Sequence, residues 1–174
     1  MSMPIFKFAE LALLPVVFLW LAVCVRHDLK SREVPVGWTV IPLAITGLMA
    51  VLSGRWGPAC LVLILVFLSD LSARRMIWGL LATVGVLLAQ PTAGALSISI
   101  FLVWALWERS LLGGADAKIL MALILLWGDS SLLLPVALAG GIQGLLAVWK
   151  KQRDIPYTVA ITLGTTGFWL TKFI

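Results

Sequence analysis

Eight apolar runs follow one another along the chain, with short polar or turn-forming stretches between them. They cover approximately residues 8–25, 36–54, 57–71, 75–90, 92–107, 117–129, 131–149 and 157–173. A helix needs roughly 20 apolar residues to cross a bilayer, and several of these runs are shorter. The runs at 57–71 and 117–129 are the weakest crossing segments and are compatible with half-buried or re-entrant helices.

Glycine- and proline-rich stretches mark the breaks between these runs, as is typical of turns. They fall at residues 53–58, 90–92, 113–114 and 128–130. The pattern therefore predicts an all-α fold, a polytopic transmembrane helical bundle of about eight membrane segments. The first segment is expected to be a retained helix, since no small-residue cleavage site follows it.

The composition excludes a water-soluble domain. Of 174 residues, 61% are hydrophobic and 12% are charged, and the mean hydropathy is +1.08. About a quarter of the residues are charged in a typical soluble domain, whose surface must be wetted. We therefore predict an integral membrane protein with one domain over residues 1–174, and no room within them for a separate soluble module.

The net charge of +5 does not indicate nucleic acid as a partner, because the basic residues lie scattered between apolar runs and form no stripe. Their distribution instead predicts a topology, because cytoplasmic connections are enriched in Lys and Arg. With eight crossings and an outside N-terminus, the inside connections hold Arg26, Lys30, Arg32, Arg74, Arg75, Arg109, Lys118, Lys150, Lys151 and Arg153. The outside set is Lys7, Arg55 and Lys172. We therefore expect both termini outside.

Two of the eight acidic residues stand out by their local sequence. Asp28 ends the first predicted helix, and Asp116 follows the turn Gly113-Gly114 directly before an apolar run. Glycines there let the backbone approach closely, and an acid at a helix start is favoured by the helix dipole. Under eight crossings, four segments separate Asp28 from Asp116, so both are expected on the inner face.

Two carboxylates brought together at a membrane surface can hydrolyse a peptide bond without a metal or cofactor. Like charges a few ångströms apart cannot both ionise easily, so the pair shares a proton. The ionised member deprotonates a water while the protonated member donates to the scissile carbonyl oxygen. The sequence contains few of the residues that other hydrolytic mechanisms require. His27 is the single histidine, and neither a zinc motif nor a nucleophilic-serine elbow occurs.

The two aspartate contexts resemble those of the type IV prepilin and preflagellin peptidases, which are GxGD-type membrane aspartyl proteases. In that family a catalytic Asp is followed seven residues later by Pro, as Asp28 is by Pro35. The second family motif, Gly-x-Gly-Asp-x-Lys, is matched by Gly113, Asp116 and Lys118. A third stretch, residues 155–164, begins Ile-Pro-Tyr and resembles the entry into the family's last helix.

The chain departs from the family pattern at several points. Ala115 replaces the second Gly of GxGD, and Val36 stands where the family usually has Asn or Asp after Pro. The segment between the two aspartates is also longer than in the family, and an extra helix pair within 57–90 would explain that. The cysteine-bearing cytoplasmic domain of the larger bacterial members is missing here, so the resemblance implies peptidase activity without evidence of methylation.

The resemblance implies a specific activity. The substrate would be a prepilin-like precursor, cleaved behind its short basic leader at the cytoplasmic face of the cell membrane. Asp28 and Asp116 would be catalytic, and Gly113, Gly114, Lys118 and Pro35 would support them. The lipid bilayer and the precursor are the partners expected, and neither metal nor cofactor is implied.

Three other hypotheses remain open at this stage. Ala115 and Val36 would fit a degenerate member that binds pilin precursors or assembly proteins without cutting them. A small transporter would place charges in the middle of its helices, whereas here Gln143 is the strong polar residue well inside a run. A structural scaffold in a secretion complex is the third.

Overall fold

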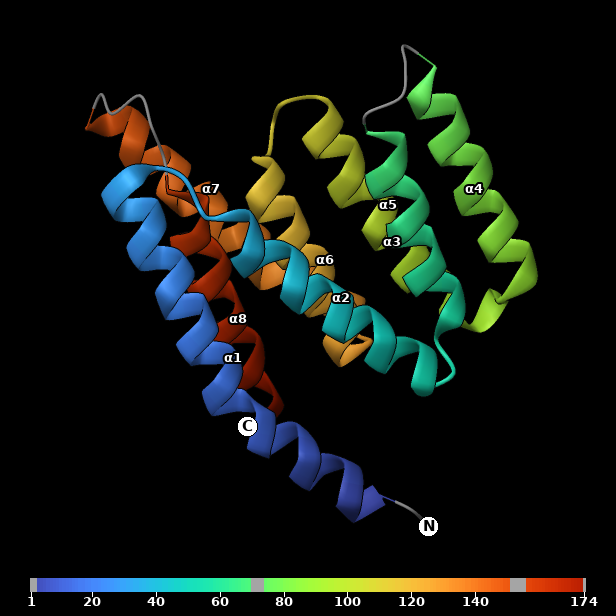
Figure 1. The fold of residues 1–174 in the computed structure, drawn as a ribbon. Helices are drawn as coiled ribbons and strands as arrows, with labels where there is room; N and C mark the ends of the chain where they lie inside the picture. The colour runs from blue at the N-terminus through green and yellow to red at the C-terminus, as the bar shows by residue number, and fades with distance from the viewer. Residues whose placement is uncertain (1–2, 70–73, 151–155, 174) are drawn as a thin grey trace. The chain divides into compact units, whose positions relative to one another are not determined.

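The computed structural model describes residues 3–69, 74–150 and 156–173, and these residues form helices without any strand (Figure 1). The α-helices are α1 (Met3–Ser31), α2 (Val36–Leu52), α3 (Trp56–Leu68), α4 (Arg75–Ala89), α5 (Gly94–Glu108), α6 (Gly114–Trp127), α7 (Leu133–Trp149) and α8 (Tyr157–Phe173). Short 3-10 turns, η1 (Pro91–Ala93) and η2 (Ser130–Leu132), precede α5 and α7. The prediction of an all-α fold is therefore confirmed.

Each predicted apolar run corresponds to one helix. By length and composition, three stretches among the described residues suffice to cross a membrane, at Ala12–Ser31, Pro91–Glu108 and Ser130–Trp149. Helices α2, α3 and α4 are apolar but shorter. Association with a membrane follows from these helices, while eight crossings stay a prediction.

The first helix continues beyond the apolar run, which ends at residue 25, and three residues past Asp28, where its end was predicted. No glycine or proline interrupts the stretch between Cys24 and Ser31, so the helix extends through its polar end. It stops where Arg32 adopts a left-handed conformation with φ 59°, and Pro35 follows directly before α2. A left-handed residue after the last turn is a common helix ending, although glycine is the usual residue there.

The chain divides into two compact units, which are described separately. The first contains residues 1–38 and 132–174, and the second contains residues 39–131. In the first unit α7 and α8 pack closely as an antiparallel pair, and α1 packs on α8 (Figure 1). The C-terminal ends of α1 and α7 therefore lie at the same end of this unit as the start of α8.

The close approach of α7 and α8 occurs at Gly164. A Cβ atom there would lie 2.6 Å from the backbone nitrogen of Val136, inside van der Waals contact. Gly141 and Gly144 of α7 take no part in this approach, since no described atom lies within 4 Å of a Cβ at either. Gly140 makes only ordinary contacts. The closest approach of the two helices therefore lies at Val136, in the first turn of α7.

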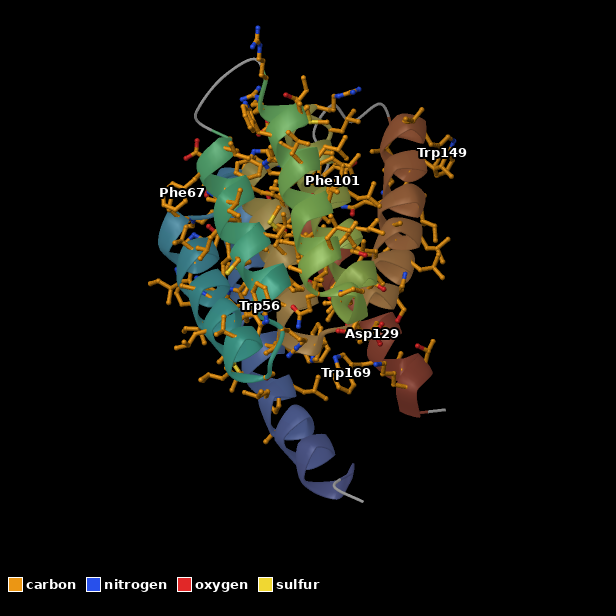
Figure 2. All side chains as sticks on the ribbon, turned by 90° about the vertical axis from the view of Figure 1, so that its right-hand side faces the viewer. Trp56, Phe67, Phe101, Asp129, Trp149 and Trp169 are labelled. Carbon is orange, nitrogen blue, oxygen red and sulfur yellow. The ribbon has the colours of Figure 1, made fainter. Side chains whose placement is uncertain are left out.

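In the second unit α6 is the central helix. Its residues Ala117 and 119–125 are all buried, and α3 and α5 pack against it. A helix that is apolar on every side is stabilised by burial on every side. The short run at 117–129 therefore forms an interior helix of this unit, and its crossing of the membrane stays a prediction. The outer helices carry exposed apolar side chains, such as Phe67 of α3 at 71% exposure (Figure 2).

Side chains fix one end of this second unit. The Arg55 guanidinium donates from Nη1 to the carbonyl oxygen of Leu125 at 2.9 Å and so caps the end of α6. The side chain of Gln90 accepts from the backbone N–H of Gly57 at 2.9 Å and donates to the carbonyl of Gly54 at 2.6 Å. The start of α3 and the ends of α4 and α6 are thus joined at this end.

Candidate active site

Asp28 lies in the last turn of α1, and its carboxylate is held by α8. The hydroxyl of Thr158 donates to Asp28 Oδ2 with an Oγ1–Oδ2 distance of 2.6 Å. Thr158 itself is 1% exposed, whereas Asp28 is half-buried. This hydrogen bond joins residues that are 130 positions apart in the sequence.

Thr158 reaches Asp28 because it occupies the first turn of α8. Pro156 directly precedes this helix, and its carbonyl accepts from the N–H of Val159 at 3.1 Å. The same carbonyl accepts from Nε2 of Gln143 on α7 at 3.0 Å. In the first unit α7 therefore holds the start of α8, and α8 holds the Asp28 carboxylate at the end of α1.

The seven-residue interval from Asp28 to Pro35 has a simple geometry. The carbonyl of Asp28 accepts from the N–H of Arg32 at 3.0 Å, which closes the last turn of α1. The chain then turns through Arg32, and the Pro35 carbonyl accepts from the N–H of Trp38 at 2.9 Å in the first turn of α2. Pro35 thus fixes the start of α2 and does not itself contact Asp28 through a hydrogen bond among the described residues.

Asp116 lies in the first turn of α6, in the second unit. Gly113 caps this helix in an extended conformation, with φ −64° and ψ 146°, which any residue can adopt. A Cβ atom at Gly113 would lie 2.8 Å from Asp116 Oδ2. Glycine therefore leaves room for this position of the carboxylate, which a side chain at residue 113 would displace.

Gly114 and Lys118 both lie against Trp107, the next-to-last residue of α5. A Cβ atom at Gly114 would lie 3.0 Å from Nε1 of the indole. On the next turn, the Lys118 ammonium lies 5.4 Å from the indole ring centre, in cation–π geometry. These two residues therefore support the start of α6 through Trp107.

The departure at Ala115 is explained by its helical position. Ala115 lies within α6, in backbone conformations where alanine is the most favourable residue, and it requires no left-handed angle. A second glycine is thus not needed to place Asp116 in this chain.

An ion pair between a partly exposed arginine and a buried glutamate lies at the same end of the second unit as Asp116. Arg75 of α4 pairs with Glu108 of α5, whose side chain is 4% exposed. Arg75 also donates to the carbonyl oxygen of Ser69 at 3.0 Å, and the indole of Trp104 donates to the Ser69 hydroxyl at 3.0 Å. This network joins the ends of α3 and α5 to the start of α4, next to the turn that leads to Asp116.

Sequence analysis missed Thr158 and Glu108. Thr158 is an ordinary threonine at the start of an apolar run, and Glu108 resembles any charged residue at a helix end. A partial signal exists for Thr158, which stands two residues after Pro156 in the stretch that resembles the family's last helix. Asp70, Asp154 and Arg153 lie outside the described residues.

Basic residues gather at the end of each unit that holds its aspartate. In the first unit Arg26, Lys30 and Arg32 flank Asp28, and Lys150 follows the end of α7. In the second unit Arg74, Arg75, Arg109 and Lys118 lie at the Asp116 end, whereas Arg55 lies at the opposite end.

Comparisons with known proteins do not assign a family. No protein-family model, curated protein or solved structure matches this chain. The assignment of function therefore depends on the residues and their geometry.

Proposed function

We propose that this protein is a membrane aspartyl endopeptidase that removes the short basic leader of prepilin-like precursors, with Asp28 and Asp116 as its catalytic pair. The observation that carries the proposal is the hydrogen bond from Thr158 to Asp28. It joins the first and third stretches of the peptidase-like pattern, which are far apart in the sequence. A hydrogen bond between residues of two short motifs so far apart in the sequence is not expected by chance.

The distribution of charge supports one common face for both carboxylates. In each unit, considered alone, the aspartate lies at the basic end, and the opposite end of the second unit carries Arg55. Because basic connections stay in the cytoplasm, both aspartates are assigned to the cytoplasmic surface of the cell membrane. The proposal includes eight crossings, with both termini outside and the extra helix pair within residues 57–90.

The cytoplasmic face suits the substrate that we propose. A precursor of this kind has a basic leader, which the same rule retains in the cytoplasm, and one apolar helix, which the bilayer accommodates. The bond to be cut then lies at the membrane surface, where this topology places both the end of α1 and the start of α6. The protein would thus recognise its substrate by position as well as by sequence.

The chemistry requires only the two carboxylates and a water. One carboxylate takes a proton from the water, whose oxygen bonds to the scissile carbonyl carbon. The other carboxyl gives its proton to the carbonyl oxygen, which forms a tetrahedral intermediate. Transfer of a proton to the amide nitrogen then breaks the carbon–nitrogen bond and re-forms the carbonyl, so that one water is consumed for each leader released.

Co-expression of the protein with a prepilin-like precursor from its own genome tests this function. We expect the wild type to remove the leader, and both Asp28→Ala and Asp116→Ala to leave the precursor uncut while they insert in the membrane normally. Asp129→Ala is the matched control. Asp129 caps its own turn by accepting from the N–H and hydroxyl of Ser131, so its loss should leave cleavage unchanged.

Two results would contradict the proposal. Cleavage that survives Asp28→Ala or Asp116→Ala would exclude the assigned pair. A wild-type protein that binds the precursor without cutting it would instead support the degenerate binding protein, the alternative that Val36 and Ala115 left open.

A further inference from the structure

Thr158 differs from the other threonines of α8 in where its hydroxyl points. The hydroxyls of Thr162 and Thr166 donate to carbonyls one turn earlier in the same helix, at 2.8 Å and 2.9 Å. That is the usual partner of a threonine in an apolar helix. Thr158 instead donates to a carboxylate on another helix, although it is 1% exposed and in the first turn of α8.

The length of this bond fits a hydroxyl that donates to a carboxylate. Such bonds lie at about 2.5–2.7 Å, while O–H···O bonds in general most often lie at about 2.7–2.8 Å. The distance from Thr158 Oγ1 to Asp28 Oδ2 is 2.6 Å. A donor at this distance occupies a lone pair of Oδ2. It also restricts rotation of the carboxylate about the Cβ–Cγ bond of Asp28.

We propose that Thr158 is a positioning residue for Asp28, and that it directs proton transfer to the other oxygen, Oδ1. The inference rests on the proposed peptidase function. Because Thr158 already donates a proton to Oδ2, a proton that Asp28 takes from the attacking water is bound at Oδ1. The water oxygen then bonds to the carbonyl carbon, and Asp28 returns the proton later in the cycle, so Thr158 neither gains nor loses a proton.

Substitutions at Thr158 separate positioning from packing. Thr158→Val keeps the shape of the side chain and removes the donor, whereas Thr158→Ser keeps the donor and removes a methyl group. The matched control is Thr165→Val. Thr165 is a fully buried threonine on the same helix, and its hydroxyl has no hydrogen-bond partner among the described residues.

Steady-state cleavage of a purified precursor in detergent micelles gives the decisive readout. We expect Thr158→Val to lower kcat by about 10- to 100-fold, the range that corresponds to one lost hydrogen bond to a charged group. KM should change by less than about twofold, because Thr158 does not contact substrate in this account. Thr158→Ser should stay within about threefold of the wild-type kcat, and Thr165→Val should match the wild type.

The outcomes distinguish this inference from the function on which it rests. Equal kcat values for Thr158→Val and Thr165→Val would overturn the inference alone, as would a Thr158→Ser variant as slow as Thr158→Val. A wild type that cuts no precursor would overturn the proposed function and the inference together. A purely structural role for Thr158 would reduce the folded fraction and leave kcat per folded molecule unchanged.

Discussion

At the scale of single residues, the position of the Asp116 carboxylate explains why Gly113 is glycine. The backbone of Gly113 is ordinary and extended, so glycine is not needed for its angles. The space where a Cβ would lie is occupied by Asp116 Oδ2, 2.8 Å away. A flexible carboxylate can move aside at little energetic cost, and a substitution at Gly113 should therefore affect chemistry more than stability.

The first prediction concerns Gly113→Ala. It should lower the cleavage rate by about 10- to 100-fold, because a displacement of about 1 Å in a catalytic group has an effect of this size. The free energy of unfolding should fall by less than about 1 kcal/mol, the usual difference between glycine and alanine at a helix N-cap. The two quantities can be measured by precursor cleavage and by thermal unfolding in detergent.

Gly141→Ala is the control for this prediction. A Cβ at Gly141 meets no described atom within 4 Å, so this variant should cleave at the wild-type rate. If Gly113→Ala cleaved as fast as Gly141→Ala, the carboxylate at Asp116 would not need the position that the structure gives it.

At the scale of helices, the crossing of α7 and α8 determines where Thr158 lies. Gly164 allows the two backbones to meet at Val136, and Gln143 bonds the carbonyl of Pro156 seven residues further along α7. These two contacts fix the start of α8 against α7. The hydroxyl of Thr158 then reaches Asp28 from a helix whose position is already determined.

We predict that Gly164→Ala destabilises this helix pair. Its added Cβ would overlap the backbone of Val136, and overpacking of this kind costs about 1–3 kcal/mol. Gly167→Ala is the matched control on the same helix. A Cβ added at Gly167 would lie 3.8 Å from Pro135 Cβ, an ordinary contact. Both substitutions raise helix propensity by the same amount. The difference between their free energies of unfolding therefore measures the overlap alone.

Thermal unfolding in detergent can measure this difference. Gly164→Ala should unfold at a lower temperature than Gly167→Ala, which should match or exceed the wild type. Equal unfolding temperatures for the two variants would show that α7 and α8 do not approach closely at Gly164.

The sequence was sufficient to locate the helices but not their contacts. Proline and glycine interrupt the apolar runs, so the breaks near residues 53–58 and 90–92 were recognisable from local sequence alone. The helix end predicted at Asp28 falls three residues short of Ser31, because no such residue precedes Arg32 and a charged segment can continue a helix past the apolar run. Burial of α6 and the bond from Thr158 to Asp28 depend on tertiary packing, which periodicity does not encode.

At the scale of the whole molecule, the charge asymmetry gives a testable topology. Basic residues follow the ends of α1, α5 and α7, whereas the loop between α2 and α3 contains Arg55 alone. With eight crossings, exposed loop residues such as Ser53 lie outside, and Ser110 and Lys150 lie inside. The same alternation assigns Asp28 and Asp116 to one face.

Labelling of single cysteines in intact cells tests this topology. Cys24 and Cys60 would first be replaced by Ala, and Ser53→Cys, Ser110→Cys and Lys150→Cys introduced one at a time. A membrane-impermeant maleimide should label Ser53→Cys in intact cells, and the other two only after the membrane is opened. Labelling of Ser110→Cys from outside would place Asp116 on the wrong face for a cytoplasmic cleavage site.

The central claim is that Asp28 and Asp116 together cleave a precursor, and the most direct measurement uses purified components. The protein would be reconstituted into vesicles with one prepilin-like precursor, and the product mass determined by mass spectrometry. We predict a single product shortened by the leader with the wild type, and intact precursor with Asp28→Asn or Asp116→Asn. A precursor that stays intact with the wild type, or that is shortened equally by either variant, would contradict this account.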